Sequence, residues 1–211
     1  MGPGQSLRRR NDPLEADRGG PRMNEPHPHE TRIRASVDRI HAALERMDSF
    51  GRGTASTRAR VRQGLTCQVE DGAWSFTADM PSKAGGSAEG PDPGVFGRAS
   101  LASCLAIGYS LWAAHAGVPI TELEVEVQAD YDTRAQFGIG DDSPAYRAIR
   151  WIVNVQSPAP EAEVREVLDL AEARSPYLAL FREPQELRRK VRIRKAGPDR
   201  TPSSHPDARE R

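Results

Sequence analysis

The sequence predicts an α+β fold in which short antiparallel sheets surround one buried helix. Residues 95–116 form the least polar segment, and residues 101–114 include no charged side chain, as in a helix buried on all sides. Segments in which polar and apolar residues alternate lie on both sides of it. The pair Asp71-Gly72 favours a tight hairpin, so we expect the strands to pair antiparallel.

Composition indicates one domain with polar tails. The 211 residues suffice for one core, and a formal net charge of zero gives no field that steers the protein toward nucleic acid or a membrane surface. No apolar run approaches the length of a membrane span. The ends are rich in Pro, Gly and charged residues, which favours disorder. The expected divisions are a disordered tail (1–30), an amphipathic helix (31–52), the folded domain (53–195) and a second tail (196–211).

The first predicted element is a helix over residues 32–49. Its apolar residues recur every three or four positions and form one stripe: Ile33, Val37, Ile40, Leu44 and Met47. We expect this helix to dock on the domain or on a partner subunit. Met23, in the first tail, is an alternative to Met1 as the start of translation.

Strands are predicted next. Leu65, Cys67 and Val69 alternate with polar residues before the Asp71-Gly72 turn, and residues 74–78 form the return strand. An earlier strand over residues 57–62 would carry Arg58, Arg60 and Arg62 on one face. Residues 81–93 lack periodicity and predict a loop.

The elements after the central helix follow in order. Alternation over residues 123–131 predicts a strand with one buried face, followed by a loop and a second strand over 149–155. Pro160 begins a helix that Ser175-Pro176 ends. The remaining predictions are a helical turn at 178–181 and a last strand at 187–194, with Val191 and Ile193 on its apolar face.

The two cysteines, Cys67 and Cys104, do not form a disulfide framework, and no Cys or His spacing matches a zinc site.

No hydrophobic segment follows Arg8, Arg9 and Arg10, so we expect no secretory signal and a cytoplasmic location. His115 is expected to contact the last carbonyl groups of the central helix.

Residues 91–117, PDPGVFGRASLASCLAIGYSLWAAHAG, resemble the central helix of the OsmC/Ohr family, the osmotically inducible and organic-hydroperoxide-resistance proteins. In that family a proline-containing loop leads into a buried helix with a cysteine among small residues, here Ala102-Ser103-Cys104-Leu105-Ala106. The strand ITELEVEVQADYD and the helix EAEVREVLDLAEARSPY fall where the family pattern has them. The resemblance covers residues 55–195 and implies an OsmC-like fold and an intertwined homodimer.

The resemblance also assigns site residues. It implies that Cys104 is the reactive thiol and that an arginine of the N-terminal strands activates it, with Arg60 and Arg62 as the candidates and Arg58 as a third. Family members that are active carry a second cysteine in a Cys-Pro pair, where this chain has Ser175-Pro176. Peroxidase members tend to carry Glu after the loop proline, where this chain has Gly94.

The family reaction is a thiol peroxidase cycle, in which a thiolate is oxidised by the peroxide to a sulfenic acid. Because a serine cannot close a disulfide, Ser175 implies that an external thiol resolves the sulfenate. Cys67 could act as resolver only if its strand adjoins Cys104, and core packing is the reading we favour for it. Ser175 also fits a helix cap, and Tyr109 and Trp112 fit the core or an interface.

Two functions stay open at this stage. The first is a thiol-dependent peroxidase for organic hydroperoxides, which uses no cofactor or metal beyond the external thiol. The second is a non-catalytic module that binds a small apolar or thiol-containing ligand. Partners expected are a second copy of the chain and that small molecule, with no nucleic acid and no membrane. A sealed apolar environment around Cys104 would favour the second function.

Overall fold

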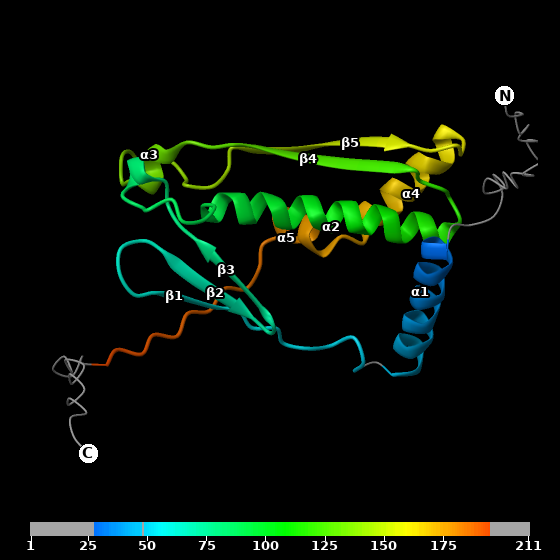
Figure 1. Cartoon of the computed structure of the whole chain (residues 1–211), viewed down its shortest axis with the longest axis horizontal. Helices are drawn as coiled ribbons and strands as arrows, with labels where there is room; N and C mark the ends of the chain where they lie inside the picture. Colours follow the sequence, from blue (N-terminus) through cyan, green and yellow to red (C-terminus); the bar gives the residue numbers. More distant parts are fainter. Residues whose placement is uncertain (1–27, 48, 195–211) are drawn as a thin grey trace, which may run out of the picture.

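The helix α2 (Pro93–Ala116) forms the centre of the molecule, as the computed structural model shows for residues 28–47 and 49–194 (Figure 1). Asp92 caps its N-terminus by accepting hydrogen bonds from the backbone N–H groups of Gly94 (2.8 Å) and Val95 (3.2 Å). Gly117 ends the helix with a φ of 77°, a left-handed conformation that glycine adopts without strain. The prediction of a central apolar helix is confirmed, but in the single chain α2 is not buried on all sides, since Ile107 is 66% exposed.

Three short strands form the N-terminal sheet: β1 (Arg58–Val61), β2 (Cys67–Asp71) and β3 (Trp74–Ala78). They pair antiparallel in the order β1-β2-β3, and Asp71 pairs with Trp74 across the predicted turn. Phe76 of this sheet packs against Phe96 of α2, with ring centroids 4.8 Å apart. Both predicted strands of the hairpin and the earlier strand are therefore confirmed.

The loop between β3 and α2 is organised by Asp79, a carboxylate that is only 2% exposed. It accepts hydrogen bonds from the backbone N–H groups of Met80 (2.7 Å), Ser87 (3.1 Å) and Glu89 (3.2 Å). The hydroxyl of Thr66 donates a fourth, at 3.0 Å. These bonds close the loop, which includes the 3₁₀ turn η1 (Ser82–Ala84), and so fix where α2 begins.

A two-stranded ribbon covers another face of α2. It consists of β4 (Glu122–Asp130) and β5 (Ala148–Gln156), which pair antiparallel from Glu122 opposite Gln156 to Asp130 opposite Ala148. The ribbon runs along α2 in Figure 1. Burial alternates along both strands, with the apolar residues toward α2, as predicted. The connecting segment contains the short helix α3 (Thr133–Gln136).

Helices complete the core. The helix α4 (Glu161–Ala173) packs on α2 through Val164, Val167 and Ala171, and α5 (Pro176–Arg182) buries Leu178. Leu101, Leu105 and Tyr109 of α2 are at most 1% exposed, and with Ala171 and Leu178 they form the buried centre. Partly buried residues of β4 and β5, including Trp151, surround this centre.

The helix α1 (Pro28–Arg46) contacts the C-terminal part of α2 and projects away from it (Figure 1). Arg34 Nε donates a hydrogen bond to the Ala114 carbonyl oxygen at 3.1 Å. Val37 is buried, whereas Ile40 and Met47 of the same apolar stripe are 50% and 56% exposed. The predicted helix is present, with its start at Pro28 rather than at 31 or 32 and its end at Arg46.

One prediction is wrong in the single chain. Residues 187–194 form no strand, and Leu187 and Ile193 are 90% and 91% exposed. Alternation predicts a strand only where a neighbouring strand supplies hydrogen bonds, and this segment has none in the described part of the chain. His115 Nδ1 lacks a hydrogen-bond partner and lies 3.6 Å from Asp38 Oδ1, and the expected contact of His115 with the last helix carbonyls stays a prediction. The first tail was predicted over residues 1–30, of which 28–30 belong to α1. Residues 1–27 and the predicted tail at 196–211 lie outside the described residues.

Candidate functional site

The sulfur of Cys104 and the hydroxyl of Ser175 face each other, with 3.4 Å between Sγ and Oγ. Cys104 comes from the middle of α2, and Ser175 lies 71 positions later, in the turn between α4 and α5. The resemblance had placed a second cysteine at position 175. The fold therefore brings the two positions into direct contact.

Ser175 is held in a defined orientation. It is 7% exposed, and its Oγ accepts a hydrogen bond from the backbone N–H of Leu178 at 3.2 Å, which caps α5. A serine hydroxyl has one hydrogen to donate besides its lone pairs. Because a lone pair takes the Leu178 N–H, that hydrogen is available to the Cys104 sulfur. The interpretation of Ser175 as a helix cap is thus correct, and the same hydroxyl also faces the thiol.

Cys104 lies at the boundary between the buried and exposed faces of α2. Leu101 and Leu105 beside it are each 1% exposed, whereas Ser103 is exposed and Ile107 is 66% exposed. Cys104 as a whole residue has intermediate exposure, and both cysteines are free. The residue is therefore not fully enclosed by the protein.

A network of polar side chains lies next to the turn that contains Ser175. The sequence alone did not predict that these residues contact one another. Glu172 Oε1 accepts hydrogen bonds from Tyr109 Oη at 2.8 Å and from Trp151 Nε1 at 3.1 Å. Burial, together with the hydrogen bond to Glu172, raises the pKa of Tyr109 above its ordinary value. Arg182 of α5 approaches Glu172 Oε2 at 4.0 Å and lies over the Trp151 ring, 5.7 Å from its centroid. This network joins α2, β5, α4 and α5 around the turn that carries Ser175.

The structure does not bring Arg60 and Arg62 to Cys104 within one chain. Arg60 Nη1 forms an ion pair with Glu70 at 2.8 Å on the N-terminal sheet. Both arginines line a hollow of about 370 Å³ on that sheet, and Cys104 is not among its lining residues. Arg58 lies on the same strand, opposite Glu70. The activating arginine therefore stays a prediction.

Cys67 belongs to β2, where it pairs with Val61 and Ala78. Its sulfur has no hydrogen bond with Cys104 in the described part of the chain, where the Cys104 sulfur contacts Ser175. This placement supports a packing role for Cys67.

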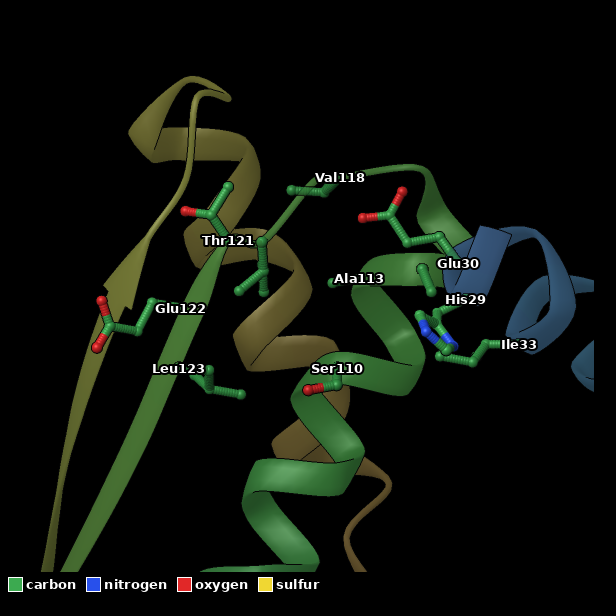
Figure 2. Close-up of a pocket in the computed structure, with 11 residues that line it drawn as sticks. His29, Glu30, Ile33, Ser110, Ala113, Val118, Thr121, Glu122 and Leu123 are labelled. Atoms are coloured by element: carbon green, nitrogen blue, oxygen red, sulfur yellow. The ribbon is translucent and has the colours of Figure 1, made fainter. Parts of the chain in front are cut away.

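A larger hollow, of about 610 Å³, lies at the C-terminal end of α2, away from the Cys104–Ser175 pair (Figure 2). It is bordered by α1, by the end of α2 and by the beginning of β4, and its walls include Ile33, Ala113, Val118 and Leu123. Neither Cys104 nor Ser175 lines it. Sequence reasoning did not find this hollow, because it depends on how α1 docks.

Within residues 28–47 and 49–194, no three His, Cys, Asp or Glu side chains come together as a metal site would require. No helix in the same ranges combines the length and apolar character needed to cross a membrane.

Residues 85–189 match the sequence model of the family described as OsmC-like protein. This segment contains α2, Cys104 and Ser175. The chain belongs to the OsmC/Ohr family. The sequence resemblance is therefore confirmed, and the arrangement of α2 between sheets is the OsmC-like fold.

Two solved structures agree on the fold. The OsmC-like protein from Mycoplasma pneumoniae is 21% identical, with a TM-score of 0.53 over 62% of this chain and 88% of that one. A hypothetical protein from Aquifex aeolicus is 11% identical, with a TM-score of 0.50 over 62% and 89% of the two chains. The organic hydroperoxide resistance protein OhrB of Bacillus subtilis is also similar, at 22% identity and a TM-score of 0.43 over 62% and 91%. No curated protein sequence matches this OsmC-like chain.

Proposed function

We propose that this OsmC-like protein is a one-cysteine thiol peroxidase that reduces organic hydroperoxides. The observation that carries the proposal is the 3.4 Å contact between Cys104 Sγ and Ser175 Oγ at a partly exposed position of α2. The thiolate is the nucleophilic form of cysteine, and the Ser175 hydroxyl can donate its hydrogen to that charge.

The reaction consists of two reductions. The Cys104 thiolate attacks one peroxide oxygen, the O–O bond breaks, and the leaving alkoxide takes a proton to become an alcohol. Cys104 is then a sulfenic acid. An external thiol attacks the sulfenic sulfur and releases water, and a second thiol reduces the mixed disulfide to restore Cys104. Ser175 cannot replace the external thiol because its oxygen forms no disulfide.

The cycle needs a compartment with abundant reduced thiols, so we place the protein in the cytoplasm. We also propose that it works as a homodimer. The apolar stripe of α1 supports this, since Ile40, Leu44 and Met47 are 39–56% exposed in the single chain. A dimer could also bring an arginine of one subunit to Cys104 of the other.

A non-catalytic module that binds a small apolar or thiol-containing ligand is the second candidate. Two observations favour it. The partner of Cys104 is a hydroxyl instead of a second thiol, and Arg60 is engaged with Glu70 instead of the sulfur.

A measurement of catalytic turnover distinguishes the peroxidase from the non-catalytic binding module. Purified protein is mixed with an organic hydroperoxide and an excess of a small thiol, and hydroperoxide consumption is followed over many equivalents. The peroxidase predicts catalytic consumption that Cys104→Ser abolishes and Cys67→Ser leaves intact. Consumption no faster than the thiol alone achieves would reject the peroxidase and leave the binding module.

A further inference from the structure

The contact between α1 and α2 includes a histidine whose buried ring nitrogen has no hydrogen-bond partner. Among the described residues, His115 Nδ1 is the one buried side-chain nitrogen or oxygen left without a partner. Asp38 Oδ1 of α1 lies 3.6 Å from it, which is too far for a hydrogen bond but within the distance of an ion pair. A buried polar atom without a partner costs free energy, so its presence here requires an explanation.

Protonation of His115 supplies one. A neutral imidazole has a hydrogen on only one of its two nitrogens, whereas both nitrogens of the charged ring are donors. The charged ring therefore always has a hydrogen on Nδ1, and a carboxylate accepts such a hydrogen in a charge-assisted bond. The Asp38 side chain is 60% exposed, so it can rotate toward Nδ1 without displacing core residues.

Aromatic rings from both helices surround His115. The ring of His41, from α1, is perpendicular to that of His115, with centroids 5.3 Å apart. The ring of Trp112, in the preceding turn of α2, is also perpendicular to it at 5.6 Å, and the His41 and Trp112 centroids are 6.1 Å apart. These three rings, with Asp38 beside them, lie where α1 docks on α2.

Other charges near this contact set the sign of the effect. Arg34 of α1 donates to the Ala114 carbonyl oxygen, and Arg174, in the turn after α4, lies over the Trp112 ring at 4.9 Å from its centroid. Both are cations, so neither attracts a charged His115. Asp38 is the only carboxylate within ion-pair distance of His115 in the described part of the chain.

His41 acts in the opposite direction to Asp38. A proton on both histidine rings would place two cations across the α1–α2 contact, and their repulsion would oppose docking. The stabilising effect of protonation therefore belongs to His115, through Asp38.

We propose that protonation of His115 tightens the docking of α1 on α2 through an ion pair with Asp38. Histidine is the side chain whose charge ordinarily changes between about pH 5 and pH 8. Because this ion pair exists only when α1 is docked, lowering the pH through that range shifts the population toward the docked helix. Arg174 directly precedes Ser175, so the docking site shares Trp112 with the turn that faces Cys104.

Hydrogen exchange in α1 measures the docking. Exchange of α1 backbone amides is followed by mass spectrometry at about pH 8 and about pH 6, and each rate is divided by the intrinsic rate at the same pH. We expect protection of α1 to be roughly threefold higher at the lower pH, a modest effect because Asp38 is largely exposed. The helix α4 contains no histidine and is the reference within the same molecule.

Variants assign the effect to the pair. His115→Gln and Asp38→Asn should each remove the pH dependence, whereas His41→Gln, which changes the same contact without removing the pair, should retain it. Unchanged protection of α4 shows that a variant is folded.

Three results would overturn the proposal: α1 protection that is equal at both pH values in the wild type, a pH dependence that persists in His115→Gln, or one that is lost in His41→Gln. The exchange measurement uses no hydroperoxide, so the peroxidase proposal can fail or stand separately.

Discussion

At Cys104 the chain has a thiol that faces a hydroxyl where the family resemblance led us to expect a second sulfur. The contact of 3.4 Å between Cys104 Sγ and Ser175 Oγ shows that side chains at these two positions reach each other. In the proposed cycle, Ser175 cannot act as the resolving residue, because a serine oxygen does not form a disulfide with a sulfenic sulfur. Cys104 supplies the thiolate of the first proposed step.

Ser175→Cys should restore a two-cysteine pair. A disulfide requires an S–S separation of about 2.05 Å, which small side-chain movements can achieve from the present contact. We expect one equivalent of organic hydroperoxide to link Cys104 to the introduced cysteine in a disulfide, detected by peptide mass without reduction. A Cys104 sulfenate that persists in the variant would mean that position 175 does not serve as the resolver.

Glu172 stabilises the turn by accepting hydrogen bonds from Tyr109, which is buried, and Trp151, which is partly buried. Glu172→Ala leaves the hydroxyl of Tyr109 and the indole N–H of Trp151 without their acceptor. Unsatisfied buried polar groups cost about 1–3 kcal/mol, so we expect the free energy of unfolding to fall by about that amount. Urea unfolding measures it, and Glu163→Ala on the exposed face of α4 provides the control. Equal effects of the two substitutions would contradict the role given to the network.

At the scale of elements, the loop from Asp79 to Asp92 determines where α2 begins. Burial alone would raise the pKa of Asp79, but its hydrogen bonds outweigh burial and lower the pKa below its ordinary value. The donors are the backbone N–H groups of Glu89, Met80 and Ser87 and the hydroxyl of Thr66. The loop thus depends on a charged carboxylate.

This lowered pKa predicts how stability changes with pH. A group with a lower pKa in the folded state stabilises the fold above its unfolded pKa of about 3.9. That stabilisation is lost as the pH falls through the folded value. We expect Asp79→Asn to lower Tm by several degrees at pH 7, and the difference from wild type to shrink as the solution is acidified. A difference in Tm that stays constant across the acid range would exclude this linkage.

Gly86 is required by the same loop. A Cβ at this position would lie 1.8 Å from the Met80 carbonyl oxygen, a contact that backbone movement alone can relieve. Gly86→Ala should therefore destabilise the protein measurably in thermal unfolding. Gly53→Ala is the matched control, because a Cβ there meets no atom within 4 Å. Similar Tm values for the two variants would show that the loop is more adaptable than its contacts indicate.

The sequence predicts most elements correctly where their burial is determined within the chain. The uncharged run in α2 and the alternation in β4 and β5 reflect contacts that one copy makes by itself. Residues 187–194 carry the same kind of pattern but form no strand, because a strand also needs an edge to pair with. Glu172 could not be found from sequence, since its partners Tyr109 and Trp151 come from two other elements.

At the scale of the whole molecule, apolar surface is left exposed at separate places: the outer half of α1, Ile107 of α2, and the segment after α5. Separate uncovered surfaces of this kind are typical of a subunit that assembles with a second copy. The candidate site is also incomplete within one chain, because the predicted activating arginines do not reach Cys104. The sequence identified Cys104 and Ser175, and the fold brings them together, whereas Arg60 and Arg62 lie on the N-terminal sheet, away from the sulfur.

We propose that Cys104 reacts with organic hydroperoxides at a higher rate than an ordinary thiol does. The measurement is the rate of site-resolved sulfenate trapping after a slight excess of hydroperoxide, with Cys67 of the same molecule as the internal reference. A peroxidase site at Cys104 predicts rapid labelling of Cys104 while Cys67 remains reduced, and no labelling in Cys104→Ser. Slow labelling of both cysteines at similar rates would contradict it.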